Sequence, residues 1–178
     1  MNRENLLTAA AAELARSSDA SLDAIARAAG LSRRAVYGHF ANRGELVSAL
    51  IARGADRLNR LATALDHADP LAAIALLGAR LWDAVDHVRL LATMALREPY
   101  VHDVASALAP VRARLREFVA RGVADGTVRH DIAAPLLARL IERAALAVLL
   151  ETAGGTPAPG QATGAVATGH GPGGDAGR

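Results

Sequence analysis

The sequence predicts an all-α protein, with an N-terminal three-helix unit followed by a helical bundle. Apolar residues recur every three or four positions from residue 4 to about residue 152, which is the period of an amphipathic helix. No segment shows the alternating β-branched pattern that is typical of strands. Proline and glycine interrupt the helical pattern at intervals that suit helices of ordinary length.

Composition narrows the class of protein further. A chain of 178 residues suits one large or two small domains and can bury a substantial core. It contains no cysteine, which excludes disulfides, thiolate metal sites and thiol nucleophiles. No apolar run reaches the roughly 20 residues that a membrane span needs, and the N-terminus shows no apolar secretion signal. A soluble, cytoplasmic protein is therefore expected.

Charge is unevenly distributed, although the formal net charge is only +2. Residues 1–60 contain nine arginines and six acidic residues, whereas residues 61–153 contain ten arginines and eleven acidic residues. All 20 basic residues are arginine. The small positive excess in the first third permits binding to nucleic acid without establishing it.

The first helices are delimited by capping residues. The first helix shows one apolar stripe, and the second is expected to begin after the N-cap Ser21 and to stop at Gly30. Ser32 then caps a short third helix. Asn42 and Glu45 have the spacing of a capping box, which predicts a long fourth helix. Further helices begin after Asp69-Pro70 and are separated by Pro99, Pro110, Pro135 and the stretch 122–131.

The end of the chain has two distinct parts. The helix expected from about Pro135 to Thr152 is apolar on more than half of its circumference. A helix that exposes one face to solvent is polar on that face. This helix is therefore expected either to lie at the centre of the bundle or to pack against a partner chain. From Gly154 onward, 12 of the 25 residues are glycine or proline, which predicts a disordered tail over residues 154–178.

Residues 22–40 have the spacing of two helices joined by a tight corner. Gly30 can adopt the positive φ that such a corner needs, and Leu31 is expected to fill the gap between the two helices. Val36 and Phe40 lie one turn apart and are expected to face inward. Arg33, Arg34 and Tyr37 are then left on the outer face, which contains no acidic residue. Such a short, basic helix is suited to the major groove of DNA.

Three runs in this region resemble the DNA-binding domain of TetR-type transcriptional repressors. They are Ile25-Ala26-Arg27-Ala28-Ala29-Gly30-Leu31-Ser32, Val36-Tyr37-Gly38-His39-Phe40 and Asn42-Arg43-Gly44-Glu45-Leu46. The family pattern is close to IA-x-x-AGVS-x-x-x-LY-x-HF-x-x-K-x-x-L, and the motif similarity covers roughly residues 4–50. The resemblance implies a DNA-binding domain over residues 1–46 and a ligand-binding and dimerisation domain over residues 47–153.

The resemblance also implies individual contacts. Arg33, Arg34 and Ala35 occupy positions at which family members contact base edges, and Ser32 begins the same helix. Tyr37, His39 and Arg43 occupy positions at which members touch the phosphate backbone. From the residues alone, Tyr37 could instead pack its ring with the hydroxyl in water, and His39 could cap the short helix.

The chain departs from the family pattern at three points. The glycine that is usual between the first two helices is missing, and that turn is about two residues short. Arg34 replaces a residue that is commonly small, so the operator sequence does not follow by analogy. Arg43 stands where lysine is usual, which keeps the charge but changes the hydrogen-bond geometry.

A dimer and a ligand cavity are the remaining expectations. Family members typically pair through their last two helices, which makes candidate interface residues of Val111, Leu115, Leu137, Ile141, Ala144 and Val148. The large or hydrogen-bonding side chains of the C-terminal domain are candidates for lining a cavity for an apolar effector. They are Trp82, His87, Met94, Tyr100 and Phe118, for which core packing or surface exposure is the plain alternative.

No motif for catalysis, a cofactor or a metal emerges from the sequence. The pairs Asp83/His87 and Glu98/His102 are spaced i, i+4, but no third metal ligand is placed near them. The predicted function is therefore a non-enzymatic, ligand-responsive transcriptional regulator, acting as a homodimeric repressor on a palindromic operator. The alternative is an all-α carrier or sensor of small molecules that does not bind an operator.

Overall fold

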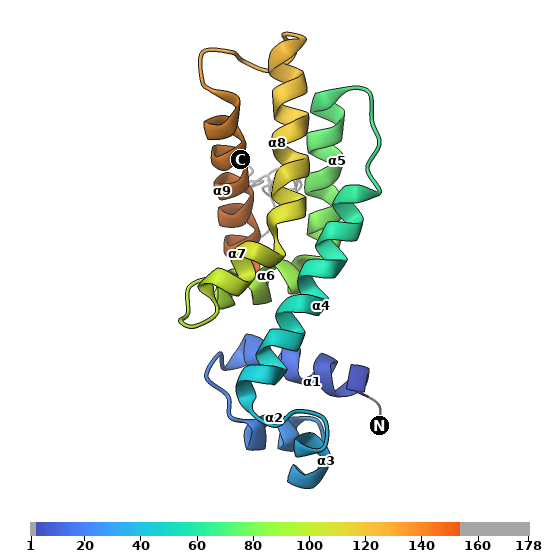
Figure 1. Ribbon diagram of the computed structural model, residues 1–178, viewed down its shortest axis with the longest axis vertical. Helices are drawn as coiled ribbons and strands as arrows, with labels where there is room; N and C mark the ends of the chain where they lie inside the picture. The colour runs from blue at the N-terminus through green and yellow to red at the C-terminus, as the bar shows by residue number, and fades with distance from the viewer. Residues whose placement is uncertain (1–2, 154–178) are drawn as a thin grey trace, which may run out of the picture.

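The structure is a computed structural model in which residues 3–153 are described. Over these residues the chain forms nine α-helices and no strand, which confirms the predicted fold class (Figure 1). The predicted disordered tail, residues 154–178, lies outside the described residues. The helices are α1 (Arg3–Arg16), α2 (Leu22–Ala28), α3 (Arg33–Tyr37), α4 (Arg43–Thr63), α5 (Pro70–Asp83), α6 (Val85–Met94), α7 (Val101–Ala107), α8 (Ala109–Ala124) and α9 (Ala134–Ala153).

The helix starts read from the sequence are confirmed by their capping hydrogen bonds. Ser21 and Ser32 each accept a hydrogen bond from the backbone N–H three residues later, at 3.2 Å in both cases. The Oδ1 of Asn42 accepts from the N–H three residues later at 2.9 Å. Asp69 caps α5 in the same way, with Pro70 at the first helical position. Each cap satisfies an N–H group that the helix itself leaves unpaired.

The nine helices of residues 3–153 are arranged along one long axis (Figure 1). Helices α1, α2 and α3 form one end, and α5, α8 and α9 lie side by side at the other end. The long helix α4 runs from the first group into the second, and it packs against α6, α7 and α8. Helices α6 and α7 lie between the two ends. Because α6 and α7 pack directly on α4, a movement of either helix would act on the helix that leads into α1–α3.

Two clusters of buried apolar side chains hold this arrangement together. The larger cluster joins α1–α4 to α6 and α7, for example through Leu46, Leu50, Leu91 and Met94. The smaller one joins the end of α4 to α5 and α8 around Phe118, whose side chain is completely buried. The larger cluster crosses the expected boundary between residues 46 and 47, which falls within α4. The larger core thus joins the α1–α3 end to α6 and α7, whereas the smaller core forms a separate cluster at the α5 and α8 end.

Candidate functional site

The corner between α2 and α3 has the geometry that the sequence predicts. Gly30 has a φ of 65°, in the left-handed region that favours glycine. The N–H of Leu31 donates to the carbonyl of Ala26 at 2.8 Å, which closes the turn after α2. Val36 is completely buried and Phe40 is 3% exposed, so both anchor α3 to the core. The short helix α3 is therefore held in a fixed orientation by apolar packing on its inner side.

The outer side of α3 is polar and open to solvent. Arg33, Arg34 and His39 are exposed, and Tyr37 is 45% exposed. The side chain of Arg34 makes no hydrogen bond or ion pair with any other residue in the range 3–153. Its guanidinium is free to use all five of its N–H donors toward another molecule. The helix thus offers an unpaired cation on a surface that the corner holds rigidly.

Arg33 is partly engaged by its own protein. Its Nε lies 2.8 Å from Oδ1 of Asp23 on α2, and its guanidinium lies 5.8 Å from the ring centroid of Tyr37. Hydrogen bonding with Tyr37 and the negative charge of Asp23 raise the pKa of Arg33. The Arg33 side chain is 71% exposed, and an ion pair this exposed is weak, so another anion can replace Asp23. The guanidinium of Arg33 is thus less available than that of Arg34 for binding another molecule.

Arg43 is engaged differently from the expected phosphate contact. Its Nη2 donates to the carbonyl of Ser18 at 2.7 Å, and its Nε donates to the carbonyl of Ala20 at 3.0 Å. Its Nη1 donates to the hydroxyl of Tyr100 at 3.3 Å. These bonds direct the guanidinium into the protein, between the α1–α2 loop and α7. The donors of Arg43 are thus engaged within the protein, and the phosphate contact predicted for this residue stays a prediction.

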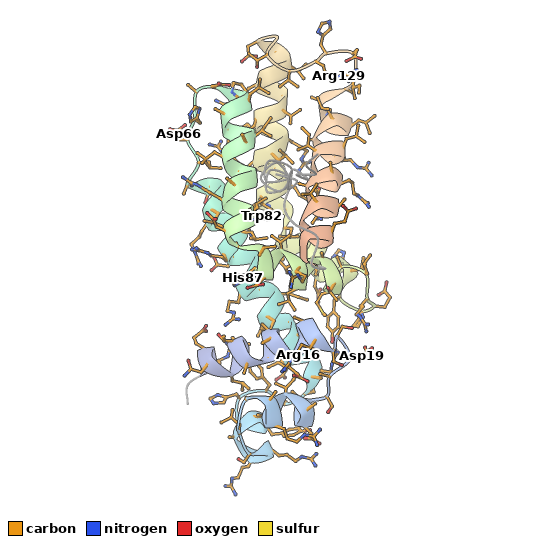
Figure 2. All side chains as sticks on the ribbon, turned by 180° about the vertical axis from the view of Figure 1, so that it is seen from behind. Arg16, Asp19, Asp66, Trp82, His87 and Arg129 are labelled. Atoms are coloured by element: carbon orange, nitrogen blue, oxygen red, sulfur yellow. The ribbon has the colours of Figure 1, made fainter. Side chains whose placement is uncertain are left out.

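A second contact joins the same two regions. Arg97, which precedes α7, forms an ion pair with Asp19 in the α1–α2 loop. Figure 2 labels Asp19 in this loop. Together with Arg43 and Tyr100, it ties the loop that leads into α2 to the loop that leads into α7. The sequence carries no signal for these pairings, because the partners are 57 and 78 residues apart.

An apolar cavity of about 140 Å³ lies within the helical bundle. Its walls come from α4, α5, α6, α7, α8 and α9, and they consist mainly of leucine, isoleucine, valine and alanine side chains. Small residues face each other across it, among them Gly78, Ala92, Ala95 and Ala145. The cavity is the space that larger side chains would have filled at these positions.

The five residues predicted to line a ligand cavity lie elsewhere. Trp82 is 37% exposed, and His87 lies in a separate groove between α1 and α6, where burial and the charges of Arg53 and Arg57 lower its pKa (Figure 2). The other three are core residues: Met94, Tyr100 and Phe118. The prediction relied on side-chain type, whereas this cavity is bounded mainly by small and aliphatic residues, and the ligand site itself stays a prediction.

Comparison with known proteins identifies the N-terminal part of the chain. Residues 6–50 match the family described as bacterial regulatory proteins, tetR family. Residues 6–50 are therefore similar to the N-terminal domain of that family. The match contains the whole of the corner and α3, together with the first part of α4. No curated protein sequence matches the chain.

Solved structures of tetR-type proteins share the fold of the whole described chain. PfmR from Thermus thermophilus, a TetR family transcriptional regulator, is 20% identical, with 84% of this chain and 85% of that chain covered and a TM-score of 0.72. The ketosteroid transcriptional regulator KstR2 of Mycobacterium tuberculosis is 22% identical, with 92% and 90% covered and a TM-score of 0.70. FadR from Bacillus subtilis, solved in complex with stearoyl-CoA, is 14% identical, with 86% and 88% covered and a TM-score of 0.68. At these identities the similarity concerns the fold.

Two charged residues of the helical bundle line its cavity and were missed by the sequence reasoning. Nε of Arg112 on α8 donates to Oε1 of Glu142 on α9 at 2.7 Å. Nη1 of Arg112 also donates to the carbonyl of Ala105 on α7 at 3.2 Å. Both side chains are about one-third exposed, at 34% and 27%. This pair joins α7, α8 and α9 at the edge of the cavity.

The predicted dimer residues are divided between two environments. Val111, Leu115 and Ile141 line the cavity, and Val111 also belongs to the smaller core cluster, so they face the interior of their own chain. Ala144 and Val148 are exposed, and Leu137 is half-buried. The most exposed apolar residues of α9 are instead Leu136, at 52%, and Leu140, at 49%. The outer face of α9 thus retains Ala144 and Val148 from the predicted set, and it presents Leu136 and Leu140 in place of Leu137 and Ile141.

Neither a membrane-spanning helix nor a metal cluster is found in the described part of the chain. No helix within residues 3–153 is both long enough and apolar enough to cross a bilayer. Within the same residues, no three histidine or acidic side chains are grouped so that they could hold a metal ion.

Proposed function

We propose that the chain is a DNA-binding transcriptional repressor whose affinity for its operator responds to a small apolar effector. The single observation that carries the DNA-binding part is the unpaired guanidinium of Arg34 on a helix whose inner side is locked into the core. Arg33 lies beside it, and a rigid pair of guanidinium groups suits the acceptor edges of guanine in the major groove. The proposal contains no catalytic step, and it places the protein in the cytoplasm, where bacterial DNA is found.

The proposed DNA contacts follow from exposure and position on α3. Ser32, Arg33, Arg34 and Ala35 form the start of the helix, where recognition helices contact base edges. Tyr37 and His39 lie at its end, and we assign them to phosphate groups beside the groove. Arg43 is left out of this set because its donors are already engaged within the protein.

The position of the cavity beside α4 supports a coupling between effector binding and DNA binding. Leu58 of α4 lines the cavity, as do Leu91 of α6 and Val104 of α7. Helices α6 and α7 in turn approach the α1–α2 loop through Arg97 and Tyr100. An effector that displaces these helices would reorient α3, since it binds one arrangement better than the other. That FadR was solved with stearoyl-CoA supports a ligand-binding role for this fold.

A palindromic operator requires two copies of α3 on one face of the duplex. We propose that the outer face of α9 forms the dimer interface, with Leu136, Leu140, Ala144 and Val148 at its centre. Apolar side chains at this exposure are unfavourable in water and are covered when a second copy packs against them. The domain division at residues 46 and 47 is part of the same proposal, with α4 continuous across it.

Leu140→Arg is expected to convert the dimer to a monomer, because an arginine at the centre of the proposed interface would be buried against its symmetric copy. Sedimentation velocity at micromolar concentration measures the change. The matched control is Leu71→Arg, which alters a similarly exposed leucine, 50% exposed, on α5. Retention of the dimer by Leu140→Arg would move the interface away from α9.

The function is tested by selection of bound fragments from the genome of the source organism, followed by gel-shift titration. We expect enrichment of a dyad-symmetric sequence, with an affinity that falls steeply as the salt concentration rises because phosphate contacts release counterions. Absence of any enriched dyad at low salt would contradict the repressor proposal. It would favour the second candidate, an all-α carrier, which the apolar cavity by itself supports.

A further inference from the structure

The residues that line the cavity indicate the polarity of the ligand that it would bind. Among the described residues that line it, Arg112 and Glu142 are the only ones with polar side chains. The remainder are aliphatic or glycine, and none is aromatic or carries a hydroxyl group. A ligand in this partly open cavity therefore meets mainly hydrocarbon walls and a single polar spot, at the edge where α7, α8 and α9 meet.

That polar spot carries no net charge. The guanidinium of Arg112 and the carboxylate of Glu142 neutralise each other across a 2.7 Å hydrogen bond. A ligand carboxylate placed there would lie beside Glu142 as well as Arg112, and a ligand ammonium would lie beside both charges in the same way. Because about two-thirds of each side chain is buried, solvent screens the repulsive contact only in part, so either charge loses part of what it gains.

An uncharged polar group meets no such conflict. The guanidinium of Arg112 has five N–H donors on three nitrogens. Nε donates to Glu142 and Nη1 donates to the carbonyl of Ala105, which leaves further N–H groups for a ligand. The Oε2 atom of Glu142 is not used in the bond to Arg112. A hydroxyl group can accept from the guanidinium and donate to the carboxylate without disturbing the pair.

The volume of the cavity limits the size of the ligand. An engineered apolar cavity of about 150 Å³ is known to accommodate benzene. The cavity of about 140 Å³ seen here is similar, which corresponds to roughly six to eight non-hydrogen atoms. A larger molecule would have to extend through the open side of the cavity or separate the surrounding helices.

We propose that the effector is a small, uncharged aliphatic molecule with one hydroxyl or carbonyl group, which is recognised by the Arg112–Glu142 pair. This inference rests on the proposed function, in which the cavity is the effector site. It specifies the class of effector by charge, size and polarity.

The first test compares three molecules with the same six-carbon chain: hexan-1-ol, hexanoate and hexylammonium. Calorimetric titration of the full chain, without DNA, should show binding of hexan-1-ol at least about tenfold tighter than binding of either ion. Equal or tighter binding of hexanoate or hexylammonium would overturn the inference. So would the absence of hexan-1-ol binding at millimolar concentration.

The second test changes which ligand the cavity prefers by removing the charge of Glu142 or of Arg112, one at a time. Glu142→Gln leaves Arg112 without its counter-charge, so the affinity for hexanoate should rise about tenfold relative to hexan-1-ol. Arg112→Gln should produce the corresponding rise for hexylammonium. The control is Glu117→Gln on the exposed side of α8, where the carboxylate pairs with Arg114 outside the cavity. An unchanged order of affinities in both cavity variants would overturn the role of the pair.

The two tests separate this inference from the proposed function. Folding of each variant is checked by its helical circular dichroism, and the first test needs no variant at all. Operator binding by the ligand-free chain is measured by gel shift on its own. Loss of operator binding with an intact ligand preference would refute the repressor and leave the ligand class standing, whereas the reverse outcome would refute only the ligand class.

Discussion

The Arg34→Ala variant is expected to bind the operator about 1–3 kcal/mol more weakly than the parent chain, with loss of discrimination at one position in each half-site. The reason is that Arg34 is exposed on α3 and pairs with no other residue of the described chain. Its whole hydrogen-bonding capacity is therefore available for DNA. Gel-shift titrations on the selected operator and on its single-base variants measure both effects.

The matched control for Arg34 is Arg60→Ala. Arg60 lies on α4, where it forms an exposed ion pair with Asp56, so its replacement removes the same charge far from α3. This variant should bind with nearly parental affinity. If Arg34→Ala instead weakens all sequences equally, Arg34 contacts phosphate groups, and the assignment of base contacts on α3 would have to be abandoned.

The Arg43→Ala variant is expected to lower the free energy of unfolding by about 1–3 kcal/mol, because charged hydrogen bonds to backbone carbonyls are lost. The carbonyls of Ser18 and Ala20 would lose these donors in a part-buried region. Urea unfolding followed by circular dichroism measures the change. Arg43→Lys should restore little of it, since a single ammonium cannot reproduce the forked geometry of a guanidinium.

The salt dependence of operator binding distinguishes this positioning role from a phosphate contact. Loss of one phosphate contact reduces the slope of log affinity against log salt by about one. The slope should remain unchanged in Arg43→Ala, even if the affinity falls. Tyr100→Phe, which removes only the 3.3 Å contact with Arg43, serves as the milder partner variant. A reduced slope in Arg43→Ala would restore the phosphate contact expected from the sequence.

The N-terminal domain could be predicted closely because its signals are local. Caps such as Ser32 act on backbone groups three residues away, and Gly30 adopts its positive φ within one turn. The inward positions of Val36 and Phe40 follow from helical period alone. Arg43 is the exception, since its partners Ser18, Ala20 and Tyr100 are distant in the sequence and no local rule identifies them.

The C-terminal bundle could be predicted only as a set of helices. The helical period of α9 shows two apolar sides, but it does not say which side packs on α6 and α8. The structure turns Ile141 inward and leaves Leu136 and Leu140 open. The cavity was missed for a related reason, because it arises where small residues of several helices face one another, and no single segment records that arrangement.

The sequence by itself determined the all-helical fold, the corner at Gly30 and the basic outer face of α3, because hydrogen bonds and apolar contacts within a few residues decide each of them. The tertiary structure alone decided that Arg43 joins the α1–α2 loop to α7, that Arg112 meets Glu142 at the cavity, and which side of α9 remains uncovered. These features depend on contacts between helices that are separated along the chain, and such contacts are selected by the packing of the whole bundle.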